Sequence, residues 1–440
     1  MKDWQPNSWQ NKLITQQPVY PSANELNEVL QRLNSMPGLV TTLEVDLLKQ
    51  HLANATKGNA FVLQGGDCAE SFADCNHSII ANKIKIILQM SLILVHGLAK
   101  PIIRIGRIAG QYAKPRSADT ETVGTITLPS YRGDLINSVD FTESARTPDP
   151  KRMLQGYFHA AATLNHIRAL VDGGFAGLQH MDAWDLGFAK HSNYADQYHR
   201  LVDSIRDTLR FIKTIGAVDE SLNRVDFFTS HEALTLHYEQ ALTHQIQNGR
   251  WYNVSTHFPW IGMRTANDNS AHIEYMRGIA NPIGMKVSSK LQPAELKQLI
   301  EVLNPNNEPG RLSLIHRFGA SHIANFLPQL IEAAQQTGIT VLWIADPMHG
   351  NTLTTETGYK TRRFDDILSE LTQAFQIHKH CGSHLGGIHF ELTGDNVTEC
   401  TGGARGLTEA DLEKAYHTLV DPRLNYEQAL EMAMLIVKTS

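Results

Sequence analysis

The chain of 440 residues has few cysteines and no long apolar run. Four thiols cannot cross-link a chain of this length, so we exclude a disulfide scaffold and expect a reducing cytoplasm. No uninterrupted apolar stretch reaches the roughly 18–20 residues of a membrane span. The start, MKDWQPNSWQNK, lacks the apolar core of a secretory signal and the Arg/Ser-rich pattern of a transit peptide. The cysteines are Cys68, Cys75, Cys381 and Cys400.

Charge and short motifs exclude further classes. Charged residues make up 19% of the chain and the formal net charge is -6, which argues against nucleic acid as the main partner. No GxGxxG or GxxxxGK[ST] follows an apolar run, and neither HExxH nor GxSxG occurs. Hydrophobic residues make up 42%, so the chain buries a large core.

Short apolar runs alternate with helical patterns after residue 57. Continuous apolar runs are typical of strands buried on both faces, and their alternation with helices favours a parallel sheet. Eight such units predict an α/β fold of the (β/α)8 barrel type. The segment 177–180 (GLQH) is open to interpretation as a ninth strand. The eight runs are 60–64, 102–108, 225–229, 258–262, 282–287, 312–317, 341–345 and 387–392.

Two regions lie outside the minimum barrel. Residues 1–57 form an N-terminal extension, a tail with two helices at 23–33 and 42–55 that we expect to pack on the barrel. Residues 58–440 form the catalytic barrel, which includes inserted helices at about 150–222, between strands two and three. Their two helical patterns, 150–173 and 194–215, are candidates for an oligomer or regulatory surface.

Basic residues gather where the predicted strands end. In a barrel, the C-terminal strand ends carry the functional groups. Arg binds phosphate and carboxylate bidentately, and Lys binds them as a point charge. Six cations exceed the need of one phosphate, and a substrate pair with two phosphates and a carboxylate fits them. The alternative is surface residues scattered in salt bridges. The six are Arg107, Lys114, Arg116, Arg264, Lys286 and Arg317.

A thiol, an imidazole and a carboxylate also follow strand ends. Cys68, His349 and Glu391, with a further acid, make a plausible divalent metal site that would admit Mn, Fe, Co or Zn. The alternative is a buried free thiol, a histidine capping the core and a glutamate capping a helix. We interpret the other three cysteines as ordinary buried thiols.

Longer sequence segments resemble those of a known protein family. The whole chain closely resembles the class II, or plant-type, 3-deoxy-D-arabino-heptulosonate 7-phosphate (DAHP) synthases. This resemblance implies a (β/α)8 barrel that condenses phosphoenolpyruvate with erythrose 4-phosphate and water, releasing phosphate, as the first step of the shikimate pathway. The strings are LQGGDCAESF (63–72), GRIAGQYAKPRSAD (106–119), SYRGD (130–134), SHEAL (230–234), WIGMRT (260–265), ANPIGMKV (280–287), DPMHGNT (346–352), TGYKTR (357–362), GGIHFELTGDNVTECTGG (386–403) and DPRLN (421–425).

The resemblance also assigns roles to single residues. Lys114 would reach both substrates, and Lys114, Cys68 and His349 are the implied catalytic set. Arg116 and Ser117 would hold the phosphate of erythrose 4-phosphate. The implied metal ligands are Cys68, His349, Glu391 and Asp421. The implied phosphoenolpyruvate groups are Arg107, Met263 through its backbone N–H, Arg264, Lys286 and Arg317.

Two motifs depart from the family pattern. Met263 stands where the family has Glu, and KVSS, with Ser288, replaces KVGP. They leave open a paralogue of secondary metabolism that makes DAHP or amino-DAHP. The complete ligand and cation sets argue against a catalytically dead regulator. The resemblance implies a divalent metal, Mn2+ first with Co2+, Fe2+ or Zn2+ as alternatives. It also implies aromatic amino acid effectors and a homodimer or homotetramer. From the net charge and the lack of a long apolar run, we expect no nucleic acid and no membrane partner.

Overall fold

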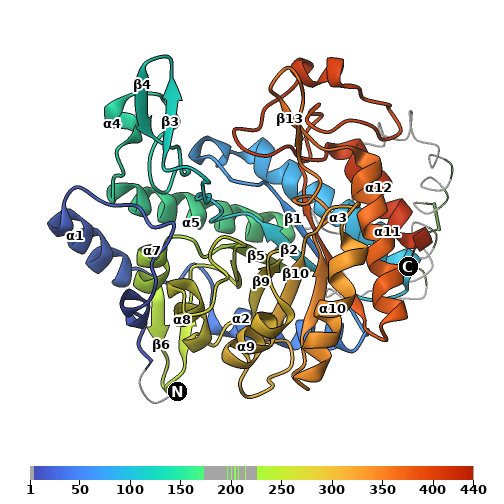
Figure 1. The fold of residues 1–440 in the computed structure, drawn as a ribbon, viewed down its shortest axis with the longest axis horizontal. Helices are drawn as coiled ribbons and strands as arrows, with labels where there is room; N and C mark the ends of the chain where they lie inside the picture. Colours follow the sequence, from blue (N-terminus) through green and yellow to red (C-terminus); the bar gives the residue numbers. More distant parts are fainter. Residues whose placement is uncertain are drawn as a thin grey trace.

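Eight parallel strands close into a barrel in the computed structural model, which describes residues 4–172 and 225–439 and isolated positions between them. Figure 1 shows the strands at the centre of a ring of helices. The prediction of a (β/α)8 barrel is therefore confirmed, and each predicted apolar run contributes one strand. Around the barrel the strands are β1 (Phe61–Gly66), β14 (Leu385–Glu391), β11 (Leu342–Ala345), β10 (Leu312–His316), β9 (Ile283–Val287), β8 (Phe258–Ile261), β5 (Phe227–Glu232) and β2 (Ile102–Arg107).

Burial explains why these segments read as continuous apolar runs. Every residue of β1, β8, β9, β10, β11 and β14 is buried, because helices cover the outer face and side chains fill the inside. The register brings functional positions together at the C-terminal edge. Gly66 of β1 stands opposite Glu391 of β14 on one side and Arg107 of β2 on the other.

A ring of helices surrounds the strands. α3 has a mean hydropathy of 1.7 over 18 residues, enough for a membrane span by composition, although lysines interrupt it. In the structure 61% of that window is buried, and α3 packs on α12, so α3 is a core helix of the barrel. The outer helices are α3 (His77–Leu98), α7 (Leu236–Ala241), α8 (Ala271–Gly278), α9 (Pro293–Leu303), α10 (Ile323–Gln336), α11 (Phe364–His380) and α12 (Tyr426–Thr439).

The N-terminal segment contains both expected helices, α1 (Ala23–Asn34) and α2 (Thr42–Thr56). Thr41 and Glu44 form a capping box that starts α2. The apolar face of α2, with Leu48 and Leu52, packs against side chains from inside the barrel. α2 thus belongs to the barrel core. A short 3-10 helix, η1 (Ser8–Asn11), precedes both helices.

The predicted insertion lies between β2 and β5. It starts with a hairpin of β3 (Thr120–Val123) and β4 (Ile126–Pro129), which projects from the barrel in Figure 1. α4 (Glu143–Arg146) and α5 (Lys151–Asp172) follow, and α5 matches the first inserted helix expected. The expected helix at 194–215 and the optional strand at 177–180 lie outside the described residues. Smaller elements are β6 (Thr243–Gln245), β7 (Trp251–Asn253), β12 (Leu353–Thr354), β13 (Lys360–Thr361), η2 (Phe72–Asp74) and η6 (Glu409–Lys414).

Candidate active site

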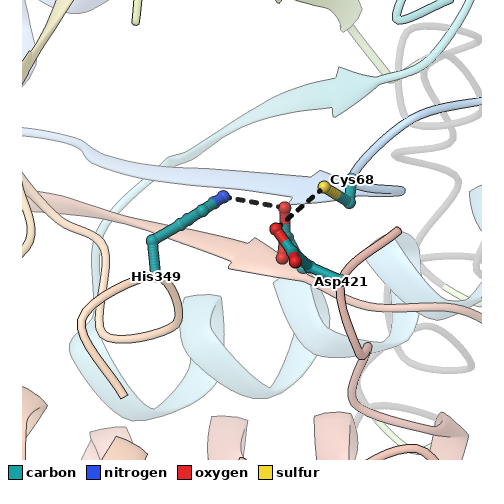
Figure 2. Close-up of side chains that lie close together, drawn as sticks. Cys68, His349 and Asp421 are labelled. Atoms are coloured by element: carbon teal, nitrogen blue, oxygen red, sulfur yellow. Dashed lines mark hydrogen bonds and ion pairs between the residues drawn. The ribbon is translucent and has the colours of Figure 1, made fainter. Parts of the chain in front are cut away.

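Four potential metal ligands meet at the C-terminal edge of the barrel. Cys68 follows β1, His349 follows β11, Glu391 ends β14, and Asp421 lies in the loop before α12. One donor atom from each lies within 4.8 Å of the others. Figure 2 shows Cys68, His349 and Asp421 pointing toward one another. The fold therefore brings together the four residues that the family resemblance implied as ligands, although they come from distant parts of the sequence.

The imidazole of His349 is fixed from behind. Its Nδ1 lies 2.7 Å from Oδ2 of Asp346, an acceptor that selects the tautomer with hydrogen on Nδ1. Its Nε2 then lies 2.9 Å from Oε1 of Glu391. In this tautomer, Nε2 of His349 and Oε1 of Glu391 both present lone pairs, which repel each other at that distance unless a proton or a cation lies between them. The arrangement of His349 and Glu391 therefore fits a cation.

Glu391 is held by two guanidinium groups. Arg107 lies 3.2 Å from its Oε1 and Arg362 lies 2.7 Å from its Oε2. Burial alone would raise the pKa of Glu391, but His349, Arg362 and Arg107 hold that pKa well below its usual range. Glu391 is thus a carboxylate. Arg362 is completely buried. It lies in the TGYKTR string, but no role was predicted for it from the sequence.

Cys68 needs a cation to become a thiolate. Burial and the charge of Glu391 raise the pKa of its thiol to about 12, although Lys114 opposes that rise. Its Sγ lies 3.6 Å from Oδ2 of Asp421 and 3.1 Å from Nζ of Lys114. One sulfur, one nitrogen and two carboxylates suit a divalent transition metal. The residues present therefore fit such an ion.

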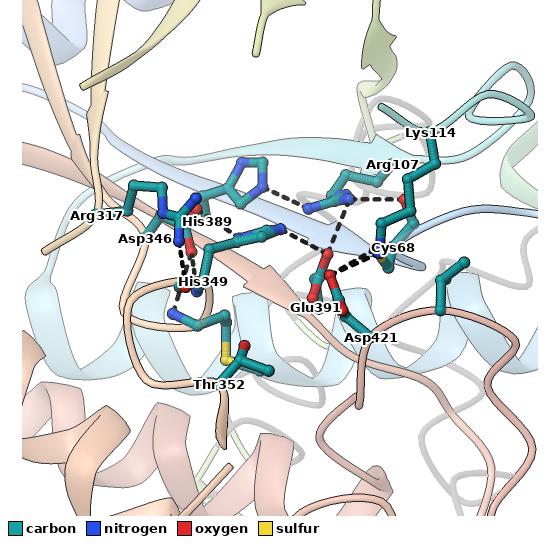
Figure 3. A network of polar contacts seen from close by, with 12 residues as sticks. Cys68, Arg107, Lys114, Arg317, Asp346, His349, Thr352, His389, Glu391 and Asp421 are labelled. Carbon is teal, nitrogen blue, oxygen red and sulfur yellow. Dashed lines mark hydrogen bonds and ion pairs between the residues drawn. The ribbon is translucent and has the colours of Figure 1, made fainter. Parts of the chain in front are cut away.

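A cationic cavity adjoins the ligand cluster, and the polar network around both is drawn in Figure 3. Burial lowers the pKa of Lys286 to about 8, while Asp346, 2.5 Å from its Nζ, opposes that change. Arg107 is buried over the ring of Trp260, with its guanidinium carbon 5.3 Å from the ring centre. The predicted residues on the cavity wall are Cys68, Arg107, Lys114, Met263, Arg264, Lys286, Arg317, His349 and Asp421.

Arg116 and Ser117 lie at the rim, outside the residues that line this cavity. The guanidinium of Arg116 pairs with Glu121 of the β3–β4 hairpin. The hydroxyl of exposed Ser117 accepts a hydrogen bond of 2.8 Å from Arg264. Arg264 thus connects the rim to the cavity, whereas Arg116 is directed toward the hairpin.

Glu232, at the end of β5, is a cavity residue to which the sequence analysis gave no role. Its Oε1 is buried and receives no hydrogen bond among the described residues. Burial raises the pKa of its carboxyl, while Lys286, Arg107 and Arg264 oppose that rise. A carboxyl group among cations, facing a cavity, is suited to proton transfer. Glu232 could have been identified from the sequence by its position at the end of the third apolar run.

The fold and the site define a (β/α)8 barrel with a metal-type ligand cluster beside an anion-binding cavity. Residues 4–437 match the class-II DAHP synthetase family, and the chain belongs to this family. It is 47% identical over 433 residues to a phospho-2-dehydro-3-deoxyheptonate aldolase of Streptomyces coelicolor, covering 98% of this chain and 96% of the relative. A Neurospora crassa protein with the same name is 46% identical over 451 residues, covering 98% and 93%. This family carries out the first step of the shikimate pathway and is generally metal-dependent.

Proposed function

We propose that the chain condenses phosphoenolpyruvate with D-erythrose 4-phosphate and water at this site, giving DAHP and phosphate. The main support for this proposal is that the metal-ligand cluster and the cationic cavity adjoin each other. A cluster able to hold a divalent cation lies directly beside a cavity lined by five Arg and Lys side chains. Two phosphorylated substrates repel each other in water, and fixed cations offset that repulsion while they orient the reacting carbons.

Cys68, His349, Glu391 and Asp421 are the proposed ligands of the metal. The bound ion would supply Lewis-acid polarisation of the aldehyde oxygen of erythrose 4-phosphate. Mn2+ is the proposed ion, with Co2+, Fe2+ and Zn2+ as alternatives, because mixed sulfur, nitrogen and oxygen donors accept all four. Arg362 and Arg107 keep Glu391 ionised, and Asp346 orients His349.

Phosphoenolpyruvate would be held by cavity cations. Arg107 and Lys286 lie deepest, both buried, and Arg317 reaches the cavity beside Met263, with 3.6 Å between its Nη1 and the Met263 sulfur. Arg264 and the backbone N–H of Met263 complete the proposed grip. Met263 thus lies against Arg317, and the predicted cations still line the cavity although Met263 stands where the family has Glu.

Lys114 is the proposed proton donor to the new alkoxide. Its Nζ lies 2.6 Å from Oδ2 of Asp421 and 3.1 Å from the sulfur of Cys68. Burial would lower the pKa of Lys114, but the carboxylates of Asp421 and Glu391 raise it. The ammonium therefore carries a proton beside the ligand cluster, where the aldehyde oxygen gains negative charge as its carbon is attacked.

Glu232 is the proposed base for water. When C3 of phosphoenolpyruvate attacks the aldehyde carbon, positive character develops at C2 and water adds there. Glu232 would take one proton of that water as the new C–O bond forms at C2, and would give it to the departing phosphate when the C2–O bond to phosphate breaks. The hydroxyl proton released as the ketone forms would pass to solvent, from which Lys114 would regain the proton that it gave to the alkoxide. Its position among Lys286, Arg107 and Arg264 supports this role.

The phosphate of erythrose 4-phosphate would bind at the rim, to Arg116 and Ser117. Arg264 donates to Ser117, so one guanidinium would touch both substrate regions. Arg116 must exchange its partner Glu121 for the phosphate.

Identification of the product distinguishes the proposed function from that of a paralogue of secondary metabolism. Purified chain with phosphoenolpyruvate, Mn2+ and erythrose 4-phosphate should give a product with the mass of DAHP. The same assay with an aminated aldose phosphate tests amino-DAHP formation, which Met263 and Ser288 left open. Faster turnover of the aminated aldose would overturn the proposed substrate.

We place the protein in the cytoplasm as a homodimer or homotetramer that binds aromatic amino acid effectors. The four cysteines are all free, which supports a reducing compartment. Exposed Val123 and Ile126 at the β3–β4 hairpin offer apolar surface for a subunit contact. The mass in solution and calorimetry with each aromatic amino acid would test the assembly and the effectors.

A further inference from the structure

The segment between η1 and α1 is fastened to the barrel on both sides of Gln16. Before it, Leu13 bridges to the start of α8, where Ala271 N–H donates to the Leu13 carbonyl at 2.9 Å. After it, the amide of Gln17 donates to the carbonyl of Leu234 at 2.6 Å and accepts from the N–H of Leu236 at 2.9 Å. Figure 1 shows this blue segment on the same side of the molecule as α7, α8 and the β3–β4 hairpin.

Gln16 itself is aimed at the rim of the candidate active site. Its Oε1 accepts from the backbone N–H of Arg116 at 2.9 Å, and its Nε2 donates to the carbonyl of Arg116 at 3.1 Å. Its Oε1 also accepts from Arg132 at 3.3 Å. The φ of Gln16 is +60°, a left-handed conformation that costs free energy in a residue other than glycine. Tail contacts on both sides hold that conformation.

Few other contacts hold the backbone at Arg116. Among the described residues, Gln16 is the only hydrogen-bond partner of its N–H and carbonyl groups. Its side chain pairs with Glu121, whose second oxygen pairs with Arg146 at 2.7 Å. A phosphate that binds Arg116 must draw the guanidinium away from Glu121. If the backbone of Arg116 is held in place, this change needs only a rotation of the side chain, and the guanidinium reaches a defined position.

We propose that Gln16 is a positioning residue for the aldose phosphate grip, acting from the N-terminal segment on the backbone of Arg116. The inference rests on the proposed function and adds a specific coupling to it. The segment that carries Gln16 sets the place of Arg116 and Ser117. Among the proposed phosphoenolpyruvate groups, Arg107 lies at the end of β2, Lys286 lies in β9 and the others lie on other loops, and Gln16 hydrogen-bonds none of them. Substitution of Gln16 should therefore weaken the binding of erythrose 4-phosphate and leave the binding of phosphoenolpyruvate nearly unchanged.

The test is steady-state kinetics for each substrate separately with three variants of Gln16. Gln16→Ala should raise the KM for erythrose 4-phosphate about five- to tenfold, the scale of one or two hydrogen bonds, with the KM for phosphoenolpyruvate within about twofold of wild type. Gln16→Gly keeps the left-handed backbone and should show the same selective change. Gln16→Glu keeps the acceptor contacts but sets a carboxylate oxygen against the carbonyl of Arg116, so the KM for erythrose 4-phosphate should rise at least as much as in Gln16→Ala.

Gln10→Ala is the matched control, because Gln10 is an exposed glutamine of the same tail for which the structure shows no side-chain bond. Its kinetics should equal those of wild type. An unchanged KM for erythrose 4-phosphate in both Gln16→Ala and Gln16→Gly would overturn the positioning role while the proposed function stands. Equal rises in both KM values would also overturn it. A wild-type protein that does not turn over the two substrates would instead overturn the proposed function.

Discussion

At the scale of single residues, Cys68 illustrates how its surroundings decide its chemistry. The thiol is buried beside two carboxylates, so without a cation it keeps its proton, and its pKa of about 12 reflects that burial. Lys114 supplies one positive charge close by, and a divalent ion would supply two more. Cys68 is therefore proposed as a metal ligand.

Cys68→Ala should bind much less divalent metal than wild type, because it removes one of four donors and the only sulfur. The fold should persist, since the side chain lies at the barrel edge and its loss leaves the apolar clusters unchanged. Metal content after dialysis, measured by atomic emission, checks this, with Cys75→Ala as the control thiol outside the site. Wild-type metal content in Cys68→Ala would contradict the assignment.

Glu232→Gln should separate binding from turnover. Removing a carboxylate from a cationic cavity should leave the affinity for phosphoenolpyruvate equal or tighter, because one source of repulsion is lost. The loss of a proton acceptor should lower kcat by about 10²–10⁴-fold. The limb of the pH–rate profile that reports ionisation of Glu232, whose pKa lies above its ordinary value, should also disappear. An unchanged kcat and profile would exclude Glu232 from proton transfer.

At the scale of elements, α11 fixes the loops that follow β10 and β11. Its Glu370 accepts from the N–H of Phe318 at 2.8 Å and from the amide of Asn351 at 2.7 Å. Arg317 and His349 lie beside those two positions in the chain. One carboxyl group on a helix thus holds together a proposed substrate loop and a proposed metal loop.

Glu370 also gives the fold a dependence on pH. Burial raises its pKa to about 7, while the N–H groups of Phe318 and Gly319 oppose that rise. Between its unfolded pKa near 4.5 and about 7, the folded state keeps a proton that the unfolded state has lost, so stability falls as pH rises, by about 3 kcal/mol in total. Glu370→Gln should remove this fall.

Thermal unfolding from pH 5 to pH 8 measures the effect of Glu370. The melting temperature of wild type should decrease over that range relative to Glu370→Gln, with Glu332→Gln, an exposed glutamate of α10, as control. Parallel curves for wild type and Glu370→Gln would show that Glu370 keeps an ordinary pKa.

The sequence predicted the barrel because strands buried on both faces leave a local signal. It also placed most of the cavity cations, since these residues lie at the C-terminal ends of strands or in the loops that follow them. Asp421 follows a long irregular segment and no strand, so only the family resemblance identified it. The surroundings of Arg362, Glu232 and Glu370 are made by residues far away in the sequence, which periodicity does not report. The pairing of Arg116 with Glu121 depends on how the β3–β4 hairpin folds back, which the sequence analysis did not resolve.

At the scale of the whole molecule, the site exists only when the barrel is closed. The four ligands lie in separate segments between residues 68 and 421, and β1 and β14 meet only at closure. A divalent ion that binds the folded chain and not the unfolded chain stabilises the fold, by about 2.7 kcal/mol at 100 times its dissociation constant. Mn2+ should therefore raise the melting temperature of wild type and leave that of Cys68→Ala unchanged. An equal rise in both would place the stabilising metal elsewhere.

We propose that the metal-ligand cluster and the cationic cavity work as one site for two substrates. The most direct measurement follows loss of phosphoenolpyruvate and release of phosphate by chelator-stripped protein, with Mn2+ and erythrose 4-phosphate each present or absent. Loss of phosphoenolpyruvate and release of phosphate should be equal, and should occur only when both Mn2+ and erythrose 4-phosphate are present. Folded protein that binds the metal and leaves phosphoenolpyruvate intact, or that consumes it without the aldose, would contradict this proposal.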